Sequence, residues 1–389
     1  MSPSATQQGA PGATLAGLEQ HPHAHAVLIP ALPPAGAPSH AYLFHGPPGV
    51  GKRTVARAFA AALLADGARQ PDTVAARVAR GAHPDLTWVT PSGASELLVS
   101  DIDEAVVAAV GHTPFESDRR VFVIEAAGTM NDQAANRLLK TLEEPPSFAH
   151  LILLAEHRED VLPTIASRCQ AVRFDALPSE LLQRRLSDPS GGAAVEPERA
   201  AACARLAAGD GRLAARLAGE QGVALRDWAE GFVGSALSAR TEERRWMALL
   251  EMAKTAGAEA GAAAGERLHE QAELLPSKER RKYEREGVDV VRRAERRART
   301  ATLDLGLQLA ELWLRDAWCV AAGAPELVFA LDRQAELAVD ASGRDAHSLL
   351  RGVELVRDTR LRLPLNVSEE LALEALAHRL SDLLAREAA

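Results

Sequence analysis

The chain has 389 residues and a formal net charge of −9, with 47% hydrophobic and 25% charged residues. The length exceeds one ordinary hydrophobic core, so we expect two or three domains, and the composition is that of a soluble globular protein. The sequence argues against two classes of protein, membrane-spanning proteins and proteins that bind DNA alone. No run approaches the roughly 18 apolar residues of a membrane span, and a protein that grips DNA alone would be basic. If the chain contacts DNA, we therefore expect it to do so as part of an assembly.

The N-terminus and the cysteines indicate a cytoplasmic protein. Residues 1–14 are rich in Ser, Pro, Gly and Ala without a basic segment followed by an apolar one, so we expect a disordered terminus and no signal peptide. The three cysteines, Cys169, Cys203 and Cys319, are far apart and form no metal-binding spacing. This usage fits a reducing compartment, and we expect Cys169 to be a buried residue and not a nucleophile.

Five short apolar runs predict buried parallel strands. Most are separated by segments long enough for a helix, and such alternation indicates an α/β domain in which helices cover both faces of a parallel sheet. We place this domain at residues 15–175. The predicted strands are Ala41–Phe44, Leu86–Thr90, Val121–Ile124, Leu151–Ala155 and Ala171–Phe174.

A glycine-rich loop follows the first predicted strand. The run Gly46–Lys52 (GPPGVGK) precedes the helical pattern of Thr54–Leu64, which is the strand–loop–helix context of a phosphate-binding P-loop. Glycines allow backbone N–H groups to turn towards phosphate oxygens, and the helix N-terminus adds partial positive charge. We expect Gly46, Gly49 and Gly51 to form this cradle and Lys52 to reach the phosphates.

Two positions that P-loop ATPases use in catalysis are altered. Arg53 stands where a Ser or Thr hydroxyl would ligate Mg²⁺, and Thr54 lies about 100° further round the helix. After the third strand, Glu125 and Ala126 stand where an Asp–Glu pair is expected, and alanine cannot act as a general base. Glu125 faces the metal position or is a solvated residue at a strand end. The two defects argue against efficient hydrolysis.

Helical patterns dominate after the last strand. We expect a small helical domain at residues 176–222, with two helices separated at Gly209–Gly211, and a helical domain at 223–389. Residues 278–299 contain ten basic and five acidic residues and predict a solvated helix or loop, or else a surface that faces DNA or a partner. The Ala/Gly-rich residues 256–265 suggest a flexible connection.

The chain resembles the delta-prime subunits of the bacterial DNA polymerase III clamp loader, which are members of the AAA+ superfamily. The resemblance covers residues 15–220 well and the remainder loosely. Four stretches support it: His40–Phe44 leading into the P-loop, Asn136–Pro146 (NRLLKTLEEPP), Ser167–Cys169 and Leu365–Val367. The fold that it implies is an AAA+ P-loop parallel-sheet module, a small helical lid and an all-helical C-terminal collar.

The resemblance also implies roles for single residues. Arg168 would act in trans as an arginine finger in a neighbour's nucleotide site, although a surface arginine paired with a carboxylate is the alternative. Arg212 resembles the arginine of the lid that contacts nucleotide, or is an ordinary surface residue. The P-loop would hold ATP or ADP weakly, if at all. The family commonly has a four-cysteine zinc module, but residues 65–84 contain no cysteine, so we expect no zinc.

The implied function is that of a clamp-loader subunit that hydrolyses little or no ATP itself. Its partners would be the gamma/tau and delta subunits, and through the complex the sliding clamp and primed DNA, with no membrane. Two alternatives stay open: an active gamma/tau-like ATPase subunit of the same loader, and an AAA+ adaptor outside replication.

Overall fold

The computed structural model describes residues 15–34, 36–91, 97–188, 194–273, 277–365 and 367–384. The N-terminus that was expected to be disordered, residues 1–14, lies outside them, as does Asn366 of the C-terminal stretch. The chain forms two compact units. The first runs to Leu177 and includes Gly209–Arg212, and the second holds Pro178–Ala208 and the chain from Leu213 onwards. The division of the helical part at residue 222 stays a prediction.

The first unit is built on a five-stranded sheet with the order β2-β3-β4-β1-β5, in which every neighbouring pair is parallel. All five predicted strands form, which confirms the expected α/β module. Apolar side chains drive this, because β3 and β4 are buried along their whole length. The strands are β1 (Ala41–His45), β2 (Leu86–Val89), β3 (Arg120–Ile124), β4 (Ala149–Ala155) and β5 (Gln170–Arg173).

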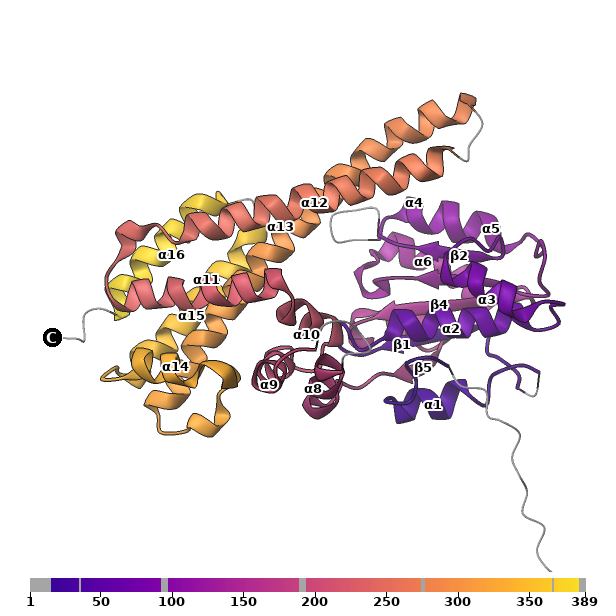
Figure 1. The fold of residues 1–389 in the computed structure, drawn as a ribbon. Coiled ribbons are helices and arrows are strands. Elements are labelled where there is room, and N and C mark those ends of the chain that lie inside the picture. Colours follow the sequence, from indigo (N-terminus) through magenta and orange to yellow (C-terminus); the bar gives the residue numbers. More distant parts are fainter. Residues whose placement is uncertain are drawn as a thin grey trace, which may run out of the picture. The chain divides into compact units, whose positions relative to one another are not determined.

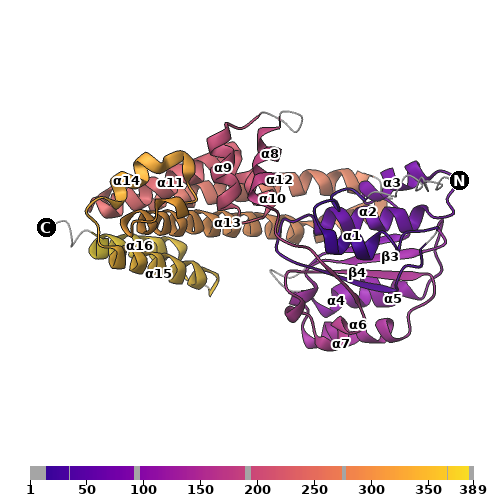
Figure 2. The same ribbon diagram turned by 90° about the horizontal axis from the view of Figure 1, so that it is seen from below.

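Helices cover both faces of this sheet (Figures 1 and 2). On one face, Leu43, Phe122 and Leu151 share an apolar cluster with residues of α4 and α6, while α2 packs on the other. The helices of the first unit are α1 (Pro22–Leu28), α2 (Lys52–Ala65), α3 (Pro71–Ala79), α4 (Val99–Ile102), α5 (Ala108–Val110), α6 (Asp132–Glu143) and α7 (Pro163–Ala166), with a π-helical turn at Asp103–Val107.

The second unit is helical throughout its described residues, as expected. Its core contains the predicted apolar stripe on α13, including Leu303, Leu307 and Leu314, packed with residues of α11, α15 and α16. The helices are α8 (Ser179–Ser187), α9 (Pro197–Leu206), α10 (Gly211–Ala218, whose first two residues group with the first unit), α11 (Glu220–Leu237), α12 (Trp246–Glu273), α13 (Ser277–Ala321), α14 (Gln334–Ala341), α15 (Ala346–Arg362) and α16 (Glu369–Leu384).

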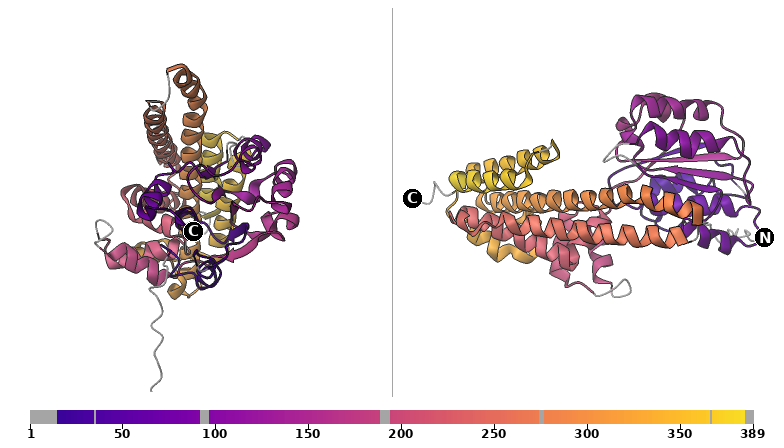
Figure 3. Two further views of the ribbon diagram at one scale, coloured as in Figure 1. Left: turned by 90° about the vertical axis from the view of Figure 1, so that its right-hand side faces the viewer. Right: turned by 90° about the horizontal axis from the view of Figure 1, so that it is seen from above.

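The flexible connection expected at residues 256–265 is wrong. These residues lie within α12, which has 28 residues and packs along the 45-residue α13 (Figure 3). Gly257 and Gly261 face the Glu295 region of α13, where a larger side chain would collide with it. The small residues therefore allow two helices to approach closely, and do not form a linker.

Two glycines of α11 give a paired test of how tightly this helix packs against the end of α10. A Cβ at Gly222 would lie 2.2 Å from the carbonyl oxygen of Arg216, whereas a Cβ at Gly234 meets nothing within 4 Å. We expect Gly222→Ala to lower the free energy of unfolding by about 1–3 kcal/mol through overpacking. Gly234→Ala should raise it by up to about 1 kcal/mol, since alanine favours a helix over glycine. Urea unfolding of the full chain measures both, and equal effects of the two variants would contradict the packing.

Candidate nucleotide-binding site

The P-loop lies between β1 and α2, as the sequence predicts. Gly46, Gly49 and Gly51 have φ angles of 144°, 66° and 103°, a region that side chains disfavour. The N–H of Gly46 donates to the carbonyl of Glu156, which follows β4, at 2.9 Å. A Cβ at Gly46 would lie 2.0 Å from the carbonyl oxygen of Phe174. The loop backbone is therefore fixed by its neighbours in conformations that favour glycine, and its role as a phosphate cradle stays a prediction.

Lys52 is turned back onto this loop. Its ammonium donates to the carbonyl of Gly46 and, at 2.6 Å, to that of Pro47. Burial lowers the pKa of Lys52, and the carboxylates of Glu156 and Asp210 oppose that shift. The lysine that would reach a nucleotide phosphate thus satisfies the loop's own carbonyl groups.

A carboxylate of the same unit lies directly against the loop. A Cβ built on Gly49 would lie 1.5 Å from Oδ1 of Asp210, so the two residues are in contact. The N–H of Gly211 donates to the carbonyl of Gly49 at 3.3 Å. Since a P-loop binds anions, a bound phosphate would meet the like charge of Asp210 here.

The two altered catalytic positions contact each other. The guanidinium of Arg53 pairs with Oε1 of Glu125 at 2.8 Å, and the indole N–H of Trp88 donates to the same oxygen. Arg57, one turn further along α2, stacks on the Trp88 ring at 4.6 Å from its centroid. In a working site Mg²⁺ lies between these two positions. In this chain the guanidinium of Arg53 supplies the positive charge beside Glu125. Glu125 is therefore an ion-paired residue and not simply a solvated residue at a strand end.

The remaining catalytic positions offer no substitute. Ala126 adopts a left-handed conformation with φ 52° and has no proton-accepting group. Thr54 is exposed on α2. Arg212 is also exposed, and its backbone N–H donates to Oδ1 of Asp210 at 2.8 Å. The position of Arg212 next to the P-loop fits the lid-arginine expectation, which stays a prediction.

Arg168 lies just after α7, at the surface of the first unit. Its guanidinium pairs with Oε1 of Glu143 at 2.7 Å and donates to the carbonyl of Thr164 at 3.0 Å. Its side chain is 38% exposed and that of Glu143 50%. The surface ion pair considered as the alternative is therefore present in this chain. Burial raises the pKa of the adjacent Cys169 thiol to about 12, which opposes formation of a thiolate.

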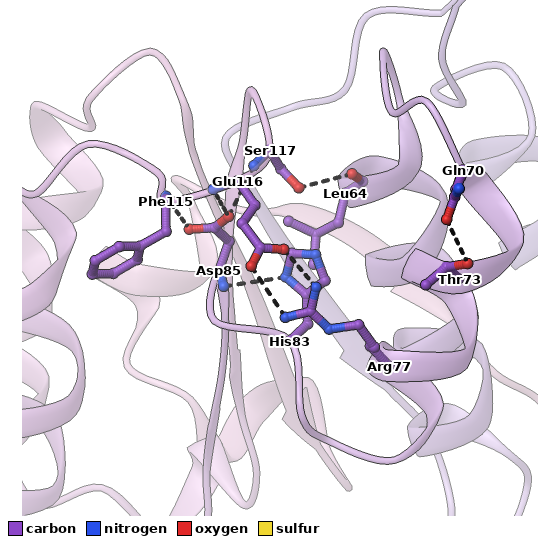
Figure 4. A network of polar contacts seen from close by, with 9 residues as sticks. All are labelled: Leu64, Gln70, Thr73, Arg77, His83, Asp85, Phe115, Glu116 and Ser117. Atoms are coloured by element: carbon purple, nitrogen blue, oxygen red, sulfur yellow. Dashed lines mark hydrogen bonds and ion pairs between the residues drawn. The ribbon is translucent and has the colours of Figure 1, made fainter.

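Residues 65–84, where zinc was not expected, belong to a different polar network (Figure 4). The buried carboxylate of Asp85 accepts the backbone N–H groups of Phe115, Glu116 and Ser117 at 2.6–3.0 Å. Arg77 of α3 pairs with Glu116, and burial lowers the pKa of His83. Within the described ranges no three His, Cys, Asp or Glu residues are grouped to hold a metal ion.

The sequence did not reveal the partners of these residues. Asp210 was noticed only as part of a helix break, and Trp88 only as part of a strand. No local sequence pattern predicts the contact of Asp210 with Gly49 or of Trp88 with Glu125, because each contact joins segments that are distant along the chain.

None of the described helices is long and apolar enough to cross a membrane.

The first unit is similar to known proteins. Residues 25–178 match the family model described as DNA polymerase III, delta subunit. The chain is 40% identical to the delta' subunit of DNA polymerase III from Pseudomonas aeruginosa over 136 residues, which cover 34% of this chain and 42% of that protein. Over these residues the chain is similar to delta-prime subunits of DNA polymerase III.

The chain is also similar to a second delta' subunit and to a gamma/tau subunit. The delta' subunit from Bacillus subtilis is 36% identical over 156 residues, or 38% of this chain and 46% of the relative. The gamma/tau subunit from Mycobacterium tuberculosis is 33% identical over 175 residues, which cover 42% of this chain and 29% of that protein. The chain thus spans less than half the length of these curated relatives. A gamma subunit-related protein from Thermotoga maritima has a TM-score of 0.42 at 16% identity, covering 89% of this chain and 96% of that one.

The contact between Asp210 and the P-loop leads to a test. Asp210→Asn should raise the affinity of the isolated chain for ATP by about tenfold, because one like charge beside the phosphates is removed. Asp72→Asn, which changes the charge equally at an exposed position on α3, is the control and should leave the affinity unchanged. Titration with a fluorescent ATP analogue measures all three proteins. Equal affinities for wild type and Asp210→Asn would show that the carboxylate does not oppose phosphate.

Proposed function

We propose that this chain is a subunit of a DNA polymerase III clamp loader that does not hydrolyse ATP at its own P-loop. The observation that carries the proposal is the Arg53–Glu125 ion pair, which joins the two positions that would hold Mg²⁺. Mg²⁺ neutralises the charge that develops on the transferring phosphoryl group, and a base or water-positioning residue orients the nucleophile. Arg53 has no hydroxyl to ligate Mg²⁺, and Ala126 cannot act as a base or position a water molecule.

The similarity to delta' subunits supports a role in DNA replication. The module resembles delta' subunits over residues 25–178, and the chain has a large helical unit besides. In this proposal the helical unit joins gamma/tau and delta subunits, and the complex opens a sliding clamp and places it on primed DNA. The identity to gamma/tau subunits favours an active ATPase as the alternative, which the two altered positions oppose.

Arg168 is the residue proposed to act in a neighbour's site. Its guanidinium is held at the surface by Glu143, and a pair between two such exposed side chains contributes only about 0–1 kcal/mol. A triphosphate carries more charge than one carboxylate and would attract the arginine more strongly. The pair with Glu143 therefore does not prevent the transfer of Arg168 to a γ-phosphate across a subunit interface.

Substitution of Arg168 tests this role. Arg168→Ala should leave assembly intact, because the side chain lies outside the core, and should lower the clamp- and DNA-stimulated ATPase rate of the assembled loader. Arginine fingers contribute about 10³–10⁵ to the rate at one site, and with several sites the overall loss is partial. Arg168→Lys should rescue poorly, since an ammonium lacks the planar fork.

Two controls accompany these variants. Glu143→Gln removes the partner and keeps the arginine, so the loader should retain its activity. Arg80→Ala removes an exposed arginine of the same unit and should have no effect. If the Arg168→Ala subunit assembles and its loader hydrolyses ATP at the wild-type rate, Arg168 is an ordinary surface residue.

A further inference from the structure

The helices of the expected lid share a hydrophobic core with the helices that follow them. We call α8, α9 and α10 the lid helices and α11 to α16 the collar helices (Figure 1). Cys203 and Leu206 of α9 and Leu217 of α10 are buried in the same apolar cluster as Phe232 of α11 and Leu303 of α13. Separating the two groups of helices would expose this apolar surface to water, so the shared core resists their separation.

Two hydrogen bonds join the same two groups of helices. The guanidinium of Arg205 in α9 donates to the carbonyl of Val328, which lies between α13 and α14, at 2.9 Å. The guanidinium of Arg216 in α10 donates to the hydroxyl of the buried Thr302 on α13 at 3.1 Å. Breaking these contacts without replacing them would leave buried polar groups unpaired, which costs more than the bonds themselves contribute.

The chain passes between its two compact units at closely spaced positions. The boundaries lie after Leu177, before Gly209 and after Arg212. The N–H of Leu177 donates to the carbonyl of Gly209 at 3.2 Å, so the first two boundaries are side by side. Helix α9 has already ended at Leu206, and Ala208 and Gly209 have φ angles of 48° and 92°. We call Leu177–Pro178 and Ala208–Gly209 the pivot, because no helix or strand runs through these two boundaries.

Only a short part of the expected lid groups with the P-loop. Gly209–Arg212 belongs to the first unit, where Asp210 contacts Gly49 and the N–H of Gly211 donates to the Gly49 carbonyl. The other residues of the lid helices belong to the second unit. Helix α10 begins at Gly211 and leads from the P-loop to Leu217 in the shared core. The four residues at the P-loop and the lid helices are therefore parts of different units.

We propose that the lid helices move with the collar helices as one rigid body about the pivot, held together by their shared core and by Arg205 and Arg216. A lid that closes over its own P-loop would have to move relative to the collar helices and disrupt that core. In this chain the lid helices change position only when the whole helical unit does.

This arrangement gives the P-loop a regulatory connection. A protein that binds the collar helices also fixes the lid helices, and α10 carries that constraint to Asp210 beside Gly49. By thermodynamic reciprocity, an anion that displaces Asp210 from the P-loop changes the affinity of the helical unit for the same protein. The rigid body depends on contacts within the chain and not on the proposed role in a clamp loader.

Distances between pairs of spin labels in the full chain test the proposal. Cysteines are placed two at a time at exposed positions of α9, α14 and α6, as Glu198→Cys, Ala338→Cys and Gln133→Cys. Burial raises the pKa of the three native cysteine thiols and disfavours their reaction, and the unsubstituted chain is the labelling control. Double electron–electron resonance should give a narrow distance distribution for the α9–α14 pair and a broad one for the α9–α6 pair.

Each other result overturns the proposal. A broad α9–α14 distribution with a narrow α9–α6 distribution would show that the lid helices move with the P-loop unit. Two narrow distributions would show that the pivot does not move, and two broad ones that the lid helices move independently. None of these results depends on assembly with loader subunits, so they are distinguishable from a failure of the proposed function.

A pair of variants tests the contacts that hold the lid helices. Arg205→Ala/Arg216→Ala removes both hydrogen bonds to the collar helices and should broaden the α9–α14 distribution. Arg69→Ala/Arg80→Ala changes the charge equally at exposed positions of the first unit and should leave that distribution narrow. Circular dichroism checks that both variants are folded, and the distances in the wild-type sequence decide the matter if the first variant is not. Equal distributions for the two folded variants would contradict the role of Arg205 and Arg216 in the proposal.

Discussion

The burial of β1 inside the parallel sheet is the constraint on which the P-loop depends. The strand pairs with β4 on one side and β5 on the other, so the chain that leaves it must turn at once to enter α2. The turn passes so close to the carbonyl of Phe174 that Gly46 has no room for a side chain. The loop backbone is therefore required by the fold itself, whether or not a nucleotide is bound, and it can persist after its catalytic side chains are replaced.

The replacements form a consistent set of charges. Arg53 and Glu125 neutralise each other, Lys52 is satisfied by loop carbonyls, and Asp210 lies against Gly49. Lys52, Arg53 and Glu125 therefore each have a partner within the chain. Arg168, which we propose to act in a neighbour's site, pairs at the surface with the carboxylate of Glu143 and donates to the carbonyl of Thr164.

Local patterns predicted much of this fold, because apolar runs and helical spacing are properties of neighbouring residues. The five strands, the break between α9 and α10, and α16 at Glu369–Leu384 follow from them. The prediction of a flexible connection at residues 256–265 was wrong for a physical reason. Glycines suggest a linker in isolation, but here they are required because Glu295 packs against α12. At the site, the sequence indicated that Arg53 and Ala126 are altered. It could not indicate that Arg53 pairs with Glu125, because that contact depends on the folding of distant segments.

The Arg53–Glu125 ion pair stands where an ATPase holds its metal ion. Electron paramagnetic resonance of Mn²⁺, titrated into the isolated chain with ATP, tests it most directly, since Mn²⁺ can replace Mg²⁺ at such sites. We expect no protein-bound Mn²⁺–ATP signal for the wild-type chain, and such a signal once Arg53→Thr is combined with Glu125→Asp. A stoichiometric Mn²⁺–ATP complex with the unaltered chain would contradict it.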